Sequence, residues 1–494
     1  MRYTAFFVLL FSGLSVFSQS GPPAPYGVLP SARQLQWHET EMYVIMHFTP
    51  TTFENKEWGY GDADPSIFNP TDFNPDQIVK SVKAGGFKGF IMVAKHHDGF
   101  CLWPTKTTPY NISKSPWKNG KGDMVKEFQQ ACKANGIKFG VYCSPWDRNN
   151  PAYGTEAYVQ TYRNQLKELY SNYGDLFMSW HDGANGGDGY YGGAKESRKI
   201  DRSVYYGWDT TWAITRKMQP GASIFSDVGW DVRWVGNERG EAGATSWATF
   251  TPTPLEGKTK VGPGEVRDDL SPEGTRNGKF WIPAECDVPL RKGWFYHPEE
   301  DSTVKSPRKL FDLYLKSVGR GAALDLGISP DRRGQLHNND VKNLAALGKI
   351  INSMYKENLA SKATILASNT RNKDSKNFGV AGLVDNKMQT YWCSDDSAKN
   401  PELTLEWKNA QTVNIIRLRE NIALGQRIEE VVCEAWMDGS WKEIATATSI
   451  GASRILYLEN PVTTNKLRVR ITKSPVAVTL SEWGVYYLTP DLLQ

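Results

Sequence analysis

Histidine and aspartate residues stand at the ends of apolar segments in the first part of this sequence. Asp182 follows the apolar segment 176–180 and precedes a glycine-rich run, while His47 and the pair His96–His97 close two earlier apolar segments. In barrel enzymes, catalytic groups lie at the C-terminal tips of parallel strands and on the loops that follow them. These positions therefore predict a catalytic carboxylate beside a polar rim that is suited to binding hydroxyl groups.

Each of these residues also has a structural interpretation. Asp182 can cap the helix that follows it, and a single histidine is more often a buried structural residue than a catalyst. Five of the seven histidines, however, lie in the first 190 residues, at positions 38, 47, 96, 97 and 181. Four of these five close predicted strands, and Tyr142 and Asp147 surround the end of another. This clustering favours a functional site.

Metal binding is the rival interpretation of the histidines. The sequence contains no H-E-x-x-H motif. Adjacent residues on a strand point to its opposite faces, so His96 and His97 are not expected to bind one ion together. The sequence therefore predicts a site without a catalytic metal and without a cofactor required for catalysis.

Strand and helix patterns alternate from residue 40 to about residue 355. Predicted strands cover residues 42–48, 87–94, 137–143, 176–180, 223–226, 279–285 and 322–327, and predicted helices cover residues 76–84, 123–135, 155–173, 209–218 and 307–318. Regular alternation over this length predicts the α/β class and a (β/α)8-like TIM barrel over residues 19–355. An open doubly wound sheet is the alternative, but no G-x-G-x-x-G motif follows the first strand.

Helical periodicity stops at the polar stretch 358–377. Beyond it, predicted strands cover residues 402–407, 413–419, 428–436, 466–471 and 483–486. They alternate at period two, with turn residues between them, which predicts an antiparallel all-β sandwich. This second domain is predicted over residues 359–490, and a chain of 494 residues is long enough for both domains.

The N-terminus has the pattern of an export signal. Arg2 provides the positive end, residues 5–17 form an apolar run too short to span a bilayer, and small residues precede a predicted cleavage after Ser18. No later run approaches transmembrane length. We therefore expect residues 1–18 to be a signal peptide and the mature protein to be periplasmic or secreted, without a membrane span.

Composition bears on partners and on redox chemistry. The net charge is +4 and no basic block occurs, so we expect no nucleic-acid partner. The six cysteines form no C-x-x-C pair, and most lie in apolar segments. They are expected to be small buried hydrophobic side chains, although one disulfide is compatible with the sequence. The sequence makes no prediction of oligomeric state.

Several motifs resemble the α-L-fucosidases of glycoside hydrolase family 29. They occur in family order at residues 47–53, 57–59, 95–103, 140–147 and 180–183, within a match over roughly residues 30–355. The resemblance implies a (β/α)8-like barrel and retaining hydrolysis of α-L-fucosides. Retaining enzymes use two carboxyl groups about 5–5.5 Å apart, one as nucleophile and the other first as acid and then as base.

The resemblance implies Asp182 as the nucleophile. Residues 232–240 resemble the branch of the family that prefers α-1,3/1,4-linked fucose on branched glycans, and there Glu238 is the acid/base. Glu285 lies in another family-like motif and is the competing candidate for that role. The run 186–206 is an insertion-like departure from the family pattern and is expected to alter the rim of the pocket.

The resemblance also implies which residues hold the sugar. They are His47, Trp58, His96, His97, Tyr142, Trp180, Glu285 and Trp294. The three histidines are expected to hold fucose hydroxyl groups, and Trp294 to contact the apolar C6 methyl group, which would favour a 6-deoxy sugar. Packing of the barrel is the structural alternative for each tryptophan.

The C-terminal region has its own resemblance. Residues 381–392 and the closing segment 481–483 resemble a discoidin-type, or coagulation factor 5/8 type C, domain. The resemblance implies a jelly-roll sandwich of a kind often used to bind carbohydrate. Asp385 lies where such domains can hold a structural calcium ion through loop oxygens. A sandwich that only supports the barrel is the alternative.

Two classes of function follow from the sequence. The first is an exo-acting α-L-fucosidase that releases terminal L-fucose from fucosylated oligosaccharides or glycoconjugates, with Glu238 as acid/base or, in a broader enzyme, Glu285. The second is a catalytically inert fucose-binding lectin on the same barrel, which needs the histidine pocket but no pair of carboxylates. The presence of both Asp182 and Glu238 favours the enzyme.

Overall fold

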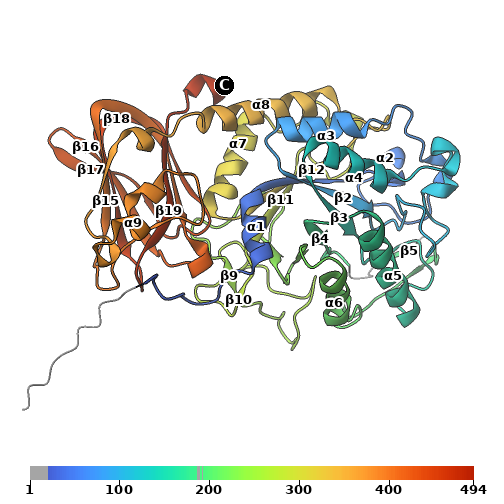
Figure 1. The fold of residues 1–494 in the computed structure, drawn as a ribbon. Coiled ribbons are helices and arrows are strands. Elements are labelled where there is room, and N and C mark those ends of the chain that lie inside the picture. The colour runs from blue at the N-terminus through green and yellow to red at the C-terminus, as the bar shows by residue number, and fades with distance from the viewer. Residues whose placement is uncertain (1–20, 186–189, 192, 494) are drawn as a thin grey trace, which may run out of the picture.

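Residues 21–185, 190–191 and 193–493 are described by a computed structural model of the chain. They form an α/β barrel followed by an antiparallel β-sheet domain (Figure 1). The predicted signal peptide and part of the run 186–206 lie outside the described residues.

Eight parallel strands close the barrel in the order β1-β12-β11-β8-β7-β4-β3-β2. Their bounds are β1 (Met42–Met46), β2 (Gly89–Lys95), β3 (Lys138–Cys143), β4 (Met178–Trp180), β7 (Ser223–Ser226), β8 (Val232–Trp234), β11 (Ala284–Pro289) and β12 (Ala323–Ile328). Nearly every residue of these strands is buried, as expected when helices cover the outside and side chains fill the inside. The predicted TIM-like barrel is confirmed.

Helices cover the outside of the barrel (Figure 1). The main ones are α1 (Ala32–Thr40), α3 (Pro75–Ala84), α4 (Met124–Asn135), α5 (Glu156–Asn172), α6 (Trp208–Met218), α7 (Pro307–Lys316) and α8 (Asn338–Met354). Their boundaries follow local chemistry. In α4, the Asp123 side chain accepts the Lys126 N–H at the start, and Gly136 takes the left-handed conformation after the last turn.

The barrel departs from the predicted elements between residues 227 and 289. The predicted strand 279–285 is divided, because β10 (Phe280–Trp281) pairs outside the barrel with β9 (Thr249–Phe250), and β11 begins only at Ala284. Pro283 separates the two strands and has no N–H to donate to a continuous ladder. The three-residue strand β8 was not predicted.

The C-terminal domain is an antiparallel sheet with the strand order β14-β19-β15-β18-β16-β17, and β13 pairs with β15. Its strands are β13 (Thr364–Ala367), β14 (Trp392–Cys393), β15 (Glu402–Glu420), β16 (Glu430–Met437), β17 (Ser440–Ala447), β18 (Arg454–Lys473) and β19 (Thr479–Tyr486). The two strands predicted at 402–407 and 413–419 are one strand, β15, with register shifts between them. Trp392 and Trp483 lie in its apolar core.

The sheet domain packs on the barrel, where β18 contacts α7. Arg417 and Arg419 on β15 form ion pairs with Glu41, which lies directly before β1. Gln426 accepts the Ala248 N–H at 2.9 Å through its amide oxygen. The predicted domain bounds stay predictions.

Two expectations about covalent and membrane structure can be compared with the fold. All six cysteines are described, and each is buried and unpaired. The disulfide that the sequence left open is therefore not formed. Among the described residues, no helix is both long enough and apolar enough to cross a bilayer.

Candidate active site

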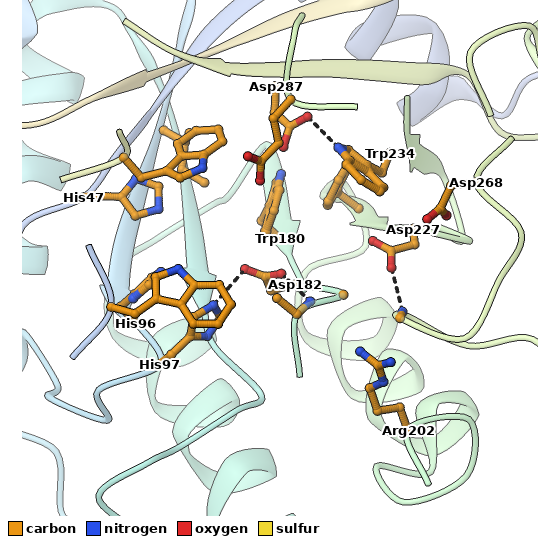
Figure 2. A pocket seen from close by; sticks show the side chains of 18 residues that line it. His47, His96, His97, Trp180, Asp182, Arg202, Asp227, Trp234, Asp268 and Asp287 are labelled. Carbon is orange, nitrogen blue, oxygen red and sulfur yellow. Dashed lines mark hydrogen bonds and ion pairs between the residues drawn. The ribbon is translucent and has the colours of Figure 1, made fainter. Parts of the chain in front are cut away.

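A cavity of about 310 Å³ opens at the C-terminal ends of the barrel strands (Figure 2). Eight of the ten predicted site residues line it: His47, Trp58, His96, His97, Trp180, Asp182, Glu238 and Trp294. The other two, Tyr142 and Glu285, lie behind this lining. These eight residues come from the end of β4 and from the segments that follow β1, β2, β4, β8 and β11.

Asp182 lies two residues after the end of β4, and its side chain is 19% exposed. The Ala184 N–H donates to Oδ1 at 2.7 Å, and the Tyr142 hydroxyl donates to Oδ2 at 2.8 Å. Burial raises the pKa of Asp182 to about 6, the two hydrogen bonds oppose that rise, and the charge of Glu238 adds to it. Asp182 is a fixed, accessible carboxylate at neutral pH, as a nucleophile must be.

Glu238 lies on the open rim of the same cavity, in the segment that follows β8. Desolvation raises the pKa of Glu238, a hydrogen bond with Trp294 lowers it, and the charge of Glu57 raises it. A raised pKa keeps a carboxyl group protonated closer to neutral pH, as a general acid requires. Glu238, Trp58 and Trp294 also border a second cavity of about 710 Å³ that continues the first one outward.

Glu285 is 0% exposed and lies beneath Trp180, inside the barrel. One carboxylate oxygen accepts the Trp180 indole N–H at 2.7 Å, and the other accepts the Tyr43 hydroxyl. The structure therefore does not bring Glu285 to the cavity where the sequence placed it. Tyr142 is 0% exposed and donates its hydroxyl to Asp182, and its contact with the sugar stays a prediction.

The three cavity histidines are neutral. Burial lowers the pKa of His47 to about 3. Burial also holds the pKa of His96 and of His97 well below the usual value, and the neighbouring His47 lowers both further. Neutral imidazoles can accept as well as donate hydrogen bonds, which suits the recognition of sugar hydroxyl groups.

The orientation predicted for the histidine pair is wrong. Strand β2 ends at Lys95, so His96 and His97 lie in the turn beyond it, with ring centroids 4.1 Å apart, and both line the cavity. Two side chains past a strand end are not bound by the alternation that holds within a strand. No group of three or more His, Cys, Asp or Glu side chains that can hold a metal ion occurs among the described residues.

The tautomer of His97 follows from its hydrogen bonds. The Ser144 hydroxyl donates to the Trp146 carbonyl at 2.8 Å, so its oxygen accepts from His97 Nδ1, also at 2.8 Å. Nδ1 therefore carries the proton, and Nε2 has a free lone pair 3.6 Å from Asp182 Oδ2. This nitrogen can accept a hydroxyl proton beside the carboxylate.

Aromatic rings form the floor and one rim of the cavity. Trp180 stacks on Phe225, with ring centroids 4.2 Å apart and planes 13° from parallel. Trp58 is 45% exposed at the rim, and its ring centroid lies 5.3 Å from that of His97. Trp294 lies 5.3 Å from His47, centroid to centroid. Such faces suit the apolar sides of a sugar ring.

Sequence reasoning missed the opposite wall, which Arg202, Asp227 and Asp268 form on the far side of Asp182 from the histidines (Figure 2). Asp227 directly follows β7, so the strand-end signal that identified Asp182 could have found it. Burial raises the pKa of Asp227 to about 7, although the Gly264 N–H donates to its Oδ2 at 2.6 Å. Arg202 belongs to the insertion-like run.

This wall is closed by two glycines. A Cβ on Gly183 would lie 1.9 Å from Asp227 Oδ2, and a Cβ on Gly264 would lie 2.4 Å from the Gly183 carbonyl oxygen. Gly264 also has φ +79°, which favours glycine. The loop after the nucleophile, Asp227 and the loop around Gly264 are therefore in direct contact.

Asp385, the predicted calcium ligand in the C-terminal domain, accepts hydrogen bonds from residues of the turn in which it lies. Its Oδ1 accepts the Lys387 N–H at 3.0 Å, and the Thr390 hydroxyl lies within 2.9 Å of both its oxygens. Calcium takes six to eight oxygen ligands. In this structure both oxygens of Asp385 have partners within the turn, and a calcium ion there would need further oxygen ligands.

A closed parallel barrel with two accessible carboxyl groups, neutral histidines and tryptophan faces at its C-terminal end has the features of a glycoside hydrolase. The family model for alpha-L-fucosidase matches residues 24–355, and the model for the F5/8 type C domain matches residues 364–483. The chain belongs to the α-L-fucosidases of glycoside hydrolase family 29.

Individual relatives agree with this assignment. The chain is 38% identical to alpha-L-fucosidase 1 of Arabidopsis thaliana over 489 residues, which cover 97% of this chain and 93% of that protein. A family 29 member from an unknown rumen bacterium superposes with a TM-score of 0.83 at 38% identity, over 95% of this chain and 80% of that one. A Ruminococcus gnavus family 29 fucosidase in complex with fucose gives 0.85 at 28% identity, over 96% and 98%.

Proposed function

We propose that the protein is an exo-acting, retaining α-L-fucosidase that releases terminal α-1,3- or α-1,4-linked L-fucose from branched glycans. Asp182 is the nucleophile and Glu238 the acid/base. The observation that carries the proposal is the pair itself, because both carboxyl groups line one cavity and the charge of one reaches the other. Retaining hydrolysis needs two carboxyl groups at one sugar-binding site.

Each carboxyl group has a distinct part in the reaction. Asp182 attacks the anomeric carbon and forms a glycosyl-enzyme, while Glu238 gives its proton to the leaving oxygen. Glu238 then takes a proton from water, and the water displaces Asp182. The donors from Tyr142 and Ala184 hold the Asp182 carboxylate in place throughout.

Fucose is held between the histidine wall and Asp182 in this proposal. The neutral imidazoles of His47, His96 and His97 bind hydroxyl groups, and Trp294 contacts the C6 methyl group. The fucose complex of the R. gnavus relative supports fucose as the ligand. A cavity of about 310 Å³ at the strand ends suits a terminal sugar.

Sugars beyond fucose have two places to lie. The second cavity, of about 710 Å³, begins at Glu238, where the leaving oxygen must be. The wall of Arg202, Asp227 and Asp268 offers charged donors and acceptors on the other side of Asp182. Two such regions beside one fucose site support a branched substrate. Arg202, which belongs to the insertion-like run, lines the cavity, and this supports the expectation that the run alters the rim of the pocket.

The substrate proposal is tested by comparing a Lewis-type trisaccharide with an aryl α-L-fucoside and measuring released fucose. We expect the trisaccharide to be hydrolysed with the higher kcat/KM, and its disaccharide lacking the branch sugar less well. Release from the aryl fucoside alone would contradict the branched-glycan preference while leaving fucosidase activity in place.

The two alternatives are less well supported. An inert lectin has no need for carboxyl groups with raised pKa on both sides of its sugar, as at Asp182 and Glu238. Glu285 as acid/base would require a proton to pass through Trp180 to a glycosidic oxygen, since Glu285 is 0% exposed beneath that ring. General acid catalysis needs hydrogen-bond reach of the substrate.

The acid side of the pH profile follows from Asp182. A protonated carboxyl group cannot attack, so kcat/KM of the wild type is expected to fall as pH decreases through about 6. The Tyr142 hydrogen bond lowers the pKa of Asp182, so Tyr142→Phe should move this limb to higher pH. The measurement is kcat/KM on an aryl fucoside from pH 4 to 9. An acid limb that moves to lower pH in Tyr142→Phe would contradict the assignment.

Removal of metal ions should leave catalysis intact. Dialysis against a strong chelator is expected to preserve kcat, and restoration of a lost activity by zinc would contradict this. Structural calcium at Asp385 stays a prediction from the domain resemblance. Its test is the Tm of the same dialysed sample with and without added calcium, in wild type and Asp385→Asn.

Export to the periplasm or the medium is also part of the proposal. It rests on residues 1–18, which lie outside the described residues. N-terminal sequencing of protein recovered outside the cytoplasm should then begin at Gln19.

The proposed partners are fucosylated oligosaccharides and glycoconjugates. Carbohydrate binding by the F5/8 type C domain is a further proposal, which rests on the match of residues 364–483 to that domain family.

A further inference from the structure

Two tryptophans of the cavity are each hydrogen-bonded to a carboxyl group on β11. The Trp180 indole N–H donates to Glu285 Oε1 at 2.7 Å. The Trp234 indole N–H donates to Asp287 Oδ1 at 2.6 Å, as Figure 2 shows. Both indoles line the cavity. Glu285 and Asp287 are two residues apart on a strand, so their side chains point the same way, into the barrel.

Each of these tryptophans ends a strand that leads to a proposed catalytic carboxyl group. Trp180 ends β4, two residues before Asp182, and Trp234 ends β8, four residues before Glu238. Strands β4 and β8 do not pair with each other, because β7 lies between them. The indoles at the ends of β4 and β8 are instead both hydrogen-bonded to side chains of β11.

The lengths of the two acidic side chains match the distances they must cover. Strand β8 is the direct neighbour of β11, and the shorter Asp287 bonds its indole. Strand β4 lies further round the barrel, in the order β11-β8-β7-β4, and the longer Glu285 reaches its indole across the interior. Along β11, Glu285 therefore bonds the indole on the distant strand β4, and Asp287 bonds the indole on the adjacent strand β8.

The anchors are themselves restrained. Glu285 accepts the Tyr43 hydroxyl, and the Tyr43 oxygen accepts the Trp37 indole N–H at 3.0 Å. Burial and the charge of Glu285 hold the pKa of the neighbouring buried Asp325 well above its usual value. Burial, together with the charges of Glu285 and Glu238, raises the pKa of Asp287 well above its usual value. A fixed side chain transmits position more faithfully than a mobile one.

We infer that Glu285 and Asp287 are positioning residues that set the separation of Asp182 and Glu238 through the indoles of Trp180 and Trp234. The inference rests on the proposed function, in which these two carboxyl groups react together. Retention needs them about 5–5.5 Å apart, and a misplacement of about 1 Å can cost roughly a hundredfold in rate. Two hydrogen bonds to one strand hold both members of the pair to a common reference.

The test is a set of double-mutant cycles on kcat for an aryl fucoside. Glu285→Ala and Trp180→Phe should each lower kcat by about ten- to a hundredfold, and the double variant should be little worse than either. Asp287→Ala and Trp234→Phe should behave in the same way. The crossed pairs, Glu285→Ala with Trp234→Phe and Asp287→Ala with Trp180→Phe, should be additive. Additive losses in the matched pairs would overturn the inference.

A matched control variant distinguishes a positioning role of these hydrogen bonds from a purely structural one. Trp103→Phe removes a buried indole donor that also bonds a glutamate, Glu168 Oε2 at 2.8 Å, but Trp103 does not line the cavity. It should lower Tm without lowering kcat per folded molecule. A loss of kcat equal to that of Trp180→Phe would contradict the inference.

Because the alanine variants can fail to fold, a second pair of variants keeps an acceptor for each indole N–H. Glu285→Gln and Asp287→Asn retain a carbonyl oxygen for the indole and should recover at least tenfold in kcat over the alanine variants, with KM changed less than kcat. Equal losses in the amide and alanine variants would count against the inference. Wild-type rates in Asp182→Ala would instead show that the proposed mechanism itself is wrong.

Discussion

Asp182→Ala should lower fucose release by at least about a thousandfold on every substrate, activated or natural. The change removes the atom that forms the glycosyl-enzyme, so no choice of leaving group can compensate. The cavity should remain, because the neighbouring loop is also held by Gly183, Asp227 and the Gly264 N–H. Fucose binding, measured by calorimetry, is therefore expected to survive.

The matched control is Asp175→Ala, which removes an exposed carboxylate near the opposite end of the same strand. It should keep wild-type kcat. Wild-type rates in Asp182→Ala would contradict the double-displacement mechanism, and loss of both activity and fucose binding would point to a collapsed site.

Glu238→Ala should divide substrates by their leaving groups. Natural glycans leave as weakly acidic alcohols and need a proton, so their hydrolysis is expected to fall by ~10²–10⁴-fold. A nitrophenolate departs without a proton, so formation of the glycosyl-enzyme should suffer less, while its hydrolysis still lacks a base. Added azide needs no base. It should restore turnover of the activated substrate and give a fucosyl azide of retained α configuration.

The same experiment on Glu285 distinguishes the two glutamates. Glu285→Ala should lose rate on both kinds of substrate and should gain nothing from azide, because the lost contact is to the Trp180 indole rather than to the substrate. If azide rescues Glu285→Ala and not Glu238→Ala, the acid/base has been assigned to the wrong residue.

The fold of the barrel was largely predictable because its strands and helices differ in period. Apolar runs of four to eight residues, separated by amphipathic segments with clear caps such as Asp123 and Gly136, indicated most of the elements. Strand β8 has three residues, too few to show a period. Pro283 made two strands look like one because apolar residues stand on both sides of it.

The site was predicted in its composition more than in its geometry. Residues at strand ends were found, but the position of the last strand residue decides where the next side chain points, and patterns leave strand ends uncertain by one or two residues. His96 and His97 show this, since both lie beyond β2 and both face the cavity. The depth of Glu285 is a tertiary property, because its burial depends on Trp180 from another strand.

The six buried thiols make the protein a reporter of its own opening. Each cysteine is at most 1% exposed, with Cys101, Cys132, Cys143 and Cys286 in the barrel and Cys393 and Cys433 in the sheet domain. A thiol reagent can therefore modify them only when the surrounding structure opens. Mass spectrometry of the modified peptides over time would measure the rate of thiol modification in each domain separately, without any substitution in the chain. Equal rates in both sets would mean that the barrel and the sheet domain unfold as one unit.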